Sequence, residues 1–183
     1  LNVTEIRIPE IKSDECLIKV KVSGICSSDI YRAFENGAYF YPLIMGHEIA
    51  GEICKIGDKV KKFKIGDLVS VFPLCPCFIC HSCKENKYAT CTNYKYYGSR
   101  NHGGFSEYIS IKEWNLINIE KIGFKNGALL EPLSVVVHCL KKSNLFNKKS
   151  SLNHNKICII GAGFLGLMLS EVIYNKNKDL EIH

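Results

Sequence analysis

The sequence contains no long hydrophobic run and no secretion signal. No segment reaches the roughly 18 apolar residues that a membrane-spanning helix needs. The first residues show no charged region followed by an apolar one, which is the pattern of a secretory leader. These absences predict a cytoplasmic protein that does not bind a membrane. The initiating methionine is also lacking and the opening residues already resemble a strand, so we expect a further N-terminal piece.

Long basic runs are lacking too, although 24 Lys and Arg against 18 Asp and Glu give a net charge of +6. The local runs at 59–62 and 141–142 are short, which indicates a solvated surface rather than a nucleic-acid face. The positive charge favours anionic substrates only weakly. With 46% hydrophobic and 23% charged residues, the 183-residue chain has the composition of a globular protein with one large domain or slightly more.

Cysteine, in contrast, is abundant, with ten residues. Disulfides would be the default in a secreted chain, but clustered spacing in a cytosolic chain indicates metal binding. Four cysteines form C-x2-C-x2-C-x7-C: Cys77, Cys80, Cys83 and Cys91. Four thiolates can close a tetrahedral zinc site with no position left for substrate, so we predict a structural zinc lobe over 75–98. A nucleic-acid zinc ribbon is a remote alternative, because it would bring two C-x2-C knuckles and a basic or aromatic reading surface.

A second group of metal donors is spread along the chain. The tripeptide Gly46-His47-Glu48 offers an imidazole and a carboxylate, both good zinc donors, although a lone histidine after a glycine is more often a packed or surface residue. Cys26 falls between a predicted strand and a short helix capped by Ser28 or Asp29. A thiol near a helix N-terminus is biased toward the thiolate that zinc requires, whereas the alternative is a buried structural cysteine.

Glu131 begins an apolar helix that we expect to be buried, with Pro132 in its first turn. A carboxylate there needs a partner. It is therefore either a zinc ligand, or a group that controls the zinc, or a charge that stabilises the helix dipole.

The remaining pattern predicts two kinds of structure. Short alternating strands at 15–22, 47–56, 68–72 and 105–111 predict a small all-β barrel. After a polar loop at 144–156, a fully buried strand is expected over 156–160, then a glycine-rich turn, a helix over 167–174 and a new strand from 180. The turn reads Gly161-Ala162-Gly163-Phe164-Leu165-Gly166. Between a strand and a helix, G-x-G-x-x-G is a dinucleotide-binding fingerprint.

These motifs make the chain resemble the zinc-dependent medium-chain dehydrogenases of the alcohol dehydrogenase superfamily, over nearly all of its length. The stretches at 8–12, 35–42, 98–100 and 131–133 are most similar to the polyol dehydrogenases. The resemblance implies an α/β chain, with a GroES-like β-barrel catalytic domain over 1–140. The start of a Rossmann NAD-binding domain would follow over 141–183.

The resemblance also implies roles for individual residues. Cys26 and His47 match ligands of a catalytic zinc, and Glu48, Glu131 or both match carboxylates that ligate or support it. Ser28 matches the hydroxyl that takes the substrate proton. The residues matched to nucleotide binding are Gly161, Gly163, Phe164, Leu165 and Gly166, and the four clustered cysteines match a structural zinc site. The full-length subunit would thus hold two Zn²⁺ ions and NAD. Ser27 departs from the usual glycine, and the acidic residue that separates NAD from NADP is not in the sequence.

The predicted reaction is hydride transfer to NAD from a polyol or sugar-phosphate hydroxyl, of the galactitol 1-phosphate or sorbitol kind. The resemblance implies a homodimer or homotetramer for the full-length protein, with no nucleic acid as partner. Two alternatives remain. The first is a catalytically incomplete fragment that only binds zinc, and the more remote one is a zinc-ribbon nucleic-acid binder.

Overall fold

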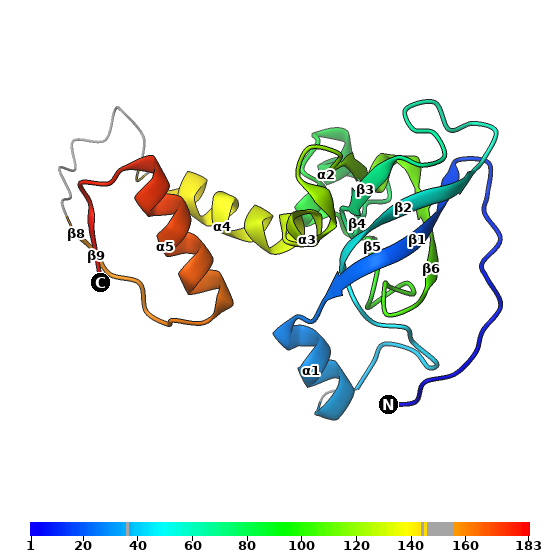
Figure 1. Ribbon diagram of the computed structural model, residues 1–183, viewed down its shortest axis with the longest axis horizontal. Coiled ribbons are helices and arrows are strands. Elements are labelled where there is room, and N and C mark those ends of the chain that lie inside the picture. The colour runs from blue at the N-terminus through cyan, green and yellow to red at the C-terminus, as the bar shows by residue number, and fades with distance from the viewer. Residues whose placement is uncertain (36, 144, 146–155) are drawn as a thin grey trace. The chain divides into compact units, whose positions relative to one another are not determined.

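A computed structural model describes residues 1–35, 37–143, 145 and 156–183 (Figure 1). Most of the polar loop predicted over 144–156 therefore lies outside the described residues. The chain divides into two compact units, Leu1–Glu131 and Pro132–His183. The domain boundary after residue 140 stays a prediction.

The first unit is built on a five-stranded antiparallel sheet with the order β6-β1-β2-β3-β7. Its strands are β1 (Glu15–Gly24), β2 (Glu48–Ile56), β3 (Leu68–Val71), β6 (Tyr108–Lys112) and β7 (Leu116–Asn118). The edge strands β6 and β7 are separated only by the 3-10 turn η2 (Glu113–Asn115). Four residue steps span at most roughly 14 Å, whereas a flat five-stranded sheet is about 19 Å wide. The sheet therefore curls, as the prediction of a small barrel requires.

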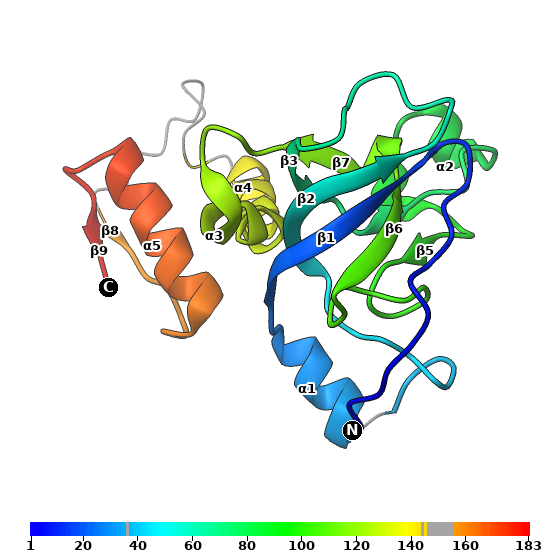
Figure 2. The same cartoon turned by 45° about the vertical axis from the view of Figure 1, so that its right-hand side comes forward.

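Aliphatic side chains from alternating strand positions fill the inside of the curled sheet. Cys16 and Ile18 of β1 are fully buried, and the pairing with β2 sets Cys16 opposite Ile56 and Ile18 opposite Ile53. The helix α3 (Gly123–Ala128) packs against β1, β2 and β3 (Figure 2) and forms a second apolar cluster with Ala50, separate from the one that contains Ile18. The Ser70 hydroxyl donates a hydrogen bond to the Gly127 carbonyl at 2.8 Å and so ties α3 to the sheet.

Smaller elements surround this sheet. The helix α1 (Ser27–Phe34) follows β1 directly (Figures 1 and 2). The cysteine-rich segment contains α2 (His81–Lys84) and η1 (Tyr88–Thr90), and it is framed by the paired strands β4 (Leu74–Cys75) and β5 (Lys95–Tyr96).

The second unit contains most of α4 (Leu130–Ser143), then β8 (Lys156–Ile157), α5 (Phe164–Lys176) and β9 (Glu181–Ile182). β8 and β9 are parallel neighbours, so the predicted strand–turn–helix–strand order is confirmed. Within the described residues no helix is long and apolar enough to cross a membrane.

Two predictions about burial are wrong. The segment 156–160 was expected to be fully buried, but Ile160 is 98% exposed. Among the described residues β8 has only β9 as a strand neighbour, whereas a buried parallel strand needs layers on both faces of its sheet. The helix α4 was also expected to be buried, yet only Pro132 and Val136 are, and Val135 is 49% exposed. The neighbours of α4 therefore leave part of its apolar surface exposed to solvent.

Candidate metal centres and nucleotide-binding turn

The pairing of β1 with β2 gathers three predicted metal ligands. The register sets Gly24, the last residue of β1, opposite Glu48, the first residue of β2. Cys26 follows β1 by two residues and His47 precedes β2 by one, so an antiparallel pair brings them to the same end of the sheet. The possible ligand atoms of Cys26, His47 and Glu48 all lie within 4.8 Å of one another. That spacing fits three donors around one tetrahedral zinc ion.

The sequence also makes room for Glu48. A Cβ atom at Gly24 would lie 2.0 Å from the Glu48 carboxylate oxygen Oε2, so any larger residue at position 24 would displace this carboxylate. Glu48 is only 7% exposed, and burial raises the pKa of its carboxyl group, while the charge of His47 lowers it and the charge of Glu131 raises it. A buried carboxylate near other acids is costly without a cation, so the donor set fits a zinc ion.

Asp29 lies next to this centre, although its position in the sequence indicates only a helix cap. Cys26, and not Ser28 or Asp29, is the N-cap of α1, which corrects that expectation. Asp29 lies three residues later and its Oδ2 accepts a hydrogen bond from the Cys26 backbone N–H at 3.2 Å. Its Oδ1 lies 3.5 Å from His47 Nδ1. The available signal was an acidic residue three positions after a cap, as in a capping box.

The contact with Asp29 sets the chemistry of His47. Burial disfavours the charged imidazolium, but the close approach and negative charge of the Asp29 carboxylate, followed by Cys26, raise the pKa of His47 to about 9. A carboxylate on Nδ1 fixes the tautomer and leaves Nε2 as the donor for a metal. A zinc ion bound at this centre would have to displace a proton from His47.

Glu131 and Ser28 lie at the margins of this centre. The Glu131 carboxylate accepts a hydrogen bond from the Tyr96 hydroxyl at 2.9 Å, and the Tyr96 ring packs edge-on against His47 at 6.0 Å between centroids. Burial, followed by the charge of Glu131, raises the pKa of Tyr96, so its hydroxyl stays a donor. Glu131 is not in the group of three close ligands, and its role at the zinc stays a prediction. Ser28 is exposed and lines a cavity of about 390 Å³ with Tyr39.

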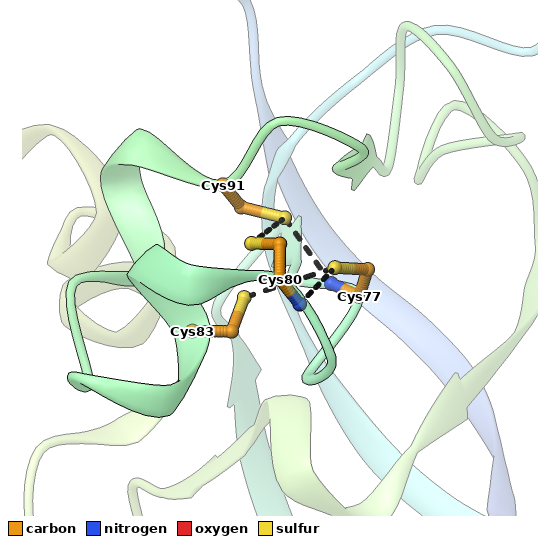
Figure 3. Close-up of side chains that lie close together, drawn as sticks. All are labelled: Cys77, Cys80, Cys83 and Cys91. Atoms are coloured by element: carbon orange, nitrogen blue, oxygen red, sulfur yellow. Dashed lines mark hydrogen bonds between the residues drawn. The ribbon is translucent and has the colours of Figure 1, made fainter.

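The four clustered cysteines form a second centre (Figure 3). Their sulfur atoms lie within 4.8 Å of one another and turn toward a common point. Backbone N–H groups support them: that of Cys77 donates to Cys91 Sγ at 3.3 Å, and that of Cys80 donates to Cys77 Sγ at 3.4 Å. Hydrogen bonds from the Thr92 backbone lower the pKa of Cys80 to about 6, and burial raises that of Cys83 to about 12. Four such thiols fit a closed structural zinc site.

The glycine-rich turn has the close backbone approach that a dinucleotide requires. Gly161 has a φ of +110°, and a Cβ at Gly166 would lie 2.0 Å from the Gly161 carbonyl oxygen. A Cβ at Gly163, the N-cap of α5, would meet nothing within 4 Å, so the space before the helix is open. The first N–H groups of a helix have no partner within the helix and attract anions. The turn therefore fits a pyrophosphate group.

Comparisons with known proteins agree with this combination of fold and centres. The family described as alcohol dehydrogenase GroES-like domain matches residues 12–121. The chain therefore belongs to the zinc-dependent medium-chain alcohol dehydrogenase family. Galactitol 1-phosphate 5-dehydrogenase of Escherichia coli K12 is 39% identical over 92% of this chain and 47% of its own length. Sorbitol dehydrogenase of Bacillus subtilis is 35% identical over 92% of this chain and 48% of its own length.

Solved structures give the same result. The crystal structure of galactitol-1-phosphate dehydrogenase from Escherichia coli has a TM-score of 0.86 and 37% identity, and covers 99% of this chain and 50% of its own. An alcohol dehydrogenase from Escherichia coli CFT073, solved with NADH, has a TM-score of 0.84 and 28% identity, with 99% and 52% covered. The chain spans about half the length of the relatives that it matches.

Proposed function

We propose that the protein containing this chain is a zinc-dependent dehydrogenase that transfers a hydride from a polyol or polyol phosphate hydroxyl to NAD. The observation that carries this proposal is the group formed by Cys26, His47 and Glu48, with Asp29 behind His47. The similarity to dehydrogenases for galactitol 1-phosphate and sorbitol supports the substrate class. Reduced thiols in both centres fit a cytoplasmic location.

The residues of this chain have distinct tasks in the proposed reaction. Cys26, His47 and Glu48 would hold the zinc, which as a Lewis acid lowers the pKa of a bound hydroxyl. Asp29 keeps His47 oriented, and the exposed Ser28 hydroxyl accepts the proton from the substrate oxygen and passes it toward solvent. NAD, when bound, would supply the acceptor for the hydride of the carbinol carbon, which would become a ketone carbon. The turn at Gly161–Gly166 would bind the pyrophosphate of NAD.

The test combines zinc content with turnover in the intact enzyme. We expect two zinc ions per subunit, and reduction of NAD with galactitol 1-phosphate or sorbitol, followed by absorbance of NADH. Cys26→Ser should remove one zinc ion and reduce kcat by at least about 100-fold, because a ligand of the reacting centre is lost. The control Cys139→Ser replaces an exposed cysteine outside both centres and should change neither quantity. Unchanged turnover in Cys26→Ser would refute the zinc assignment.

A second function, zinc binding without turnover, is favoured by one observation. In the described residues of the second unit, the parallel sheet has two strands of two residues each. A fluorescence titration of the 183-residue chain with NADH separates the two functions. Binding that Gly166→Val abolishes supports the dehydrogenase, whereas retained zinc with no NADH binding supports the second function.

A further inference from the structure

A cavity that shares Tyr39 with the cavity of Ser28 contains an arginine in contact with two aromatic rings. The cavity has a volume of about 460 Å³, and its lining includes Tyr39, Asn93, Tyr94, Lys95 and Arg100. The Arg100 guanidinium carbon lies 4.1 Å from the ring centroid of Tyr39 and 4.6 Å from that of Tyr94. Cation–π contacts with two rings restrict the guanidinium group, and its N–H groups can still donate to a ligand.

The arginine has no acidic partner among the described residues, within which no ion pair involves it. Lys95 lines the same cavity and adds a second positive charge, and Asn93 adds an amide. A planar guanidinium with free N–H donors binds phosphate in a bidentate manner. The lining therefore suits a compact dianion better than a neutral polyol.

The turn that carries Arg100 is fixed to the metal centre. The backbone N–H groups of Arg100 and Asn101 both donate to the Tyr96 carbonyl at 2.9 Å, and the Tyr96 ring contacts His47. Gly98 has a φ of +81°, and a Cβ there would lie 2.6 Å from the Gly46 carbonyl oxygen, so the turn rests on the residue before His47. Tyr39 also lines the cavity that contains Ser28, so one residue borders both cavities.

We propose that Arg100, held by Tyr39 and Tyr94 and assisted by Lys95, binds the phosphate group of a polyol phosphate whose distal hydroxyl is oxidised at the Cys26–His47–Glu48 centre. This inference rests on the proposed dehydrogenase function and specifies its substrate class. An open-chain polyol phosphate has its anionic end several bonds from the oxidised hydroxyl, which matches two adjoining cavities. Unphosphorylated polyols leave the cavity of Arg100 empty and react less efficiently.

The test compares phosphorylated and unphosphorylated substrates in the intact enzyme. Arg100→Gln should lower kcat/KM for galactitol 1-phosphate by about 10- to 100-fold, the value of a charge-assisted hydrogen-bond pair. The same variant should change kcat/KM for galactitol by less than about twofold, because galactitol has no phosphate to lose. Arg100→Lys should restore only part of the loss, since an ammonium cannot replace the stacked fork.

Lys55→Gln is the matched control for charge. Lys55 is exposed near the far end of β2, eight strand residues or roughly 26 Å from His47. It should leave both substrates unaffected. An equal loss for both substrates in Arg100→Gln, or an equal loss in Lys55→Gln, would overturn the inference.

If the enzyme turns over neither substrate, that result refutes the proposed function alone. A binding experiment tests the role of Arg100 independently of turnover. Calorimetric titration of the zinc-loaded chain with galactitol 1-phosphate should show binding that Arg100→Gln weakens at least about tenfold. Inorganic phosphate should compete with that binding. Equal affinity of Arg100→Gln and the unmodified chain for galactitol 1-phosphate, or no binding by either, would refute the role of Arg100.

Discussion

At the scale of single residues, Asp29 connects the parts of the candidate catalytic centre. One oxygen holds the backbone of Cys26 and the other faces His47 Nδ1, so a single carboxylate links the end of β1 to the start of β2. Asp29 is only 2% exposed, and Arg32 lies 3.6 Å from it. Its burial is tolerated because cationic or hydrogen-bonding groups surround it.

Asp29→Asn tests this positioning role. The amide keeps the shape but loses the charge, so His47 becomes a weaker donor and the tautomer is less well fixed. We expect affinity for the catalytic zinc to fall about 10- to 100-fold, with the cysteine-bound zinc retained. Competition with a chelator, followed by metal analysis, measures both ions separately. Loss of both ions together would indicate global damage instead.

The raised pKa of His47 predicts a pH dependence of stability in the zinc-free chain. The folded pKa of about 9 exceeds the ordinary value of 6.5, so the folded state binds the proton more tightly. This contribution is complete below about pH 6.5 and is lost as the pH rises through 9. Urea midpoints of the chelated chain should therefore fall over this window. The fall should be smaller in Asp29→Asn, and an identical profile in the two proteins would contradict the account.

Sequence patterns predicted which candidate metal donors would lie close together better than they predicted the contacts around those donors. Spacing alone indicated the Cys77–Cys91 lobe, because four local cysteines need no knowledge of the fold. The resemblance matched Cys26 and His47 to ligands of the same zinc ion. The pairing of β1 with β2 then sets both residues at the same end of the sheet. The second contact of Asp29 and the stacking of Arg100 depend on residues far apart in the chain, and no local pattern contains them.

At the scale of secondary structure, the cysteine lobe contains very little regular structure. Its helix α2 has four residues and η1 has three, too short to be stable alone. Phe78 and Asn86 have positive φ angles of 59° and 58°, a conformation that costs free energy in residues other than glycine. We infer that zinc bonds hold this segment in place.

Cys83→Ser should therefore unfold the lobe without unfolding the sheet. Loss of one thiolate from four removes the zinc ion and the local folding free energy that it supplies. Hydrogen exchange should speed up over residues 77–91, while amides of β1 and β2 stay protected. Cys54→Ser is the control, because Cys54 is an exposed thiol on β2 outside both centres. Unchanged exchange over 77–91 in Cys83→Ser would show that the lobe does not need zinc.

At the scale of the whole molecule, the two units differ in how completely they bury apolar residues. The first unit contains a core of fully buried aliphatic side chains, among them Ile18, Ile49 and Ile111. Among the described residues of the second unit only a few side chains are buried, including Ile173. Local periodicity predicted β1, β2, β3 and α5, but it did not predict β7 or α3, and the strand expected over 156–160 is only the two residues of β8. It could not predict burial, because burial depends on neighbouring layers that the pattern of one segment does not contain.

The exposed apolar surface of the second unit predicts self-association of the 183-residue chain. Ile160 is 98% exposed, Leu167 62% and Phe164 52%, and the short strands β8 and β9 each have a free edge among the described residues. Contiguous apolar surface and free edges promote association between copies. Sedimentation velocity should show a weight-average mass that rises with concentration, and Leu167→Lys should lower it. Val3→Lys adds the same charge at another exposed apolar position and should leave the association unchanged, while a single monomeric species at every concentration would contradict the prediction.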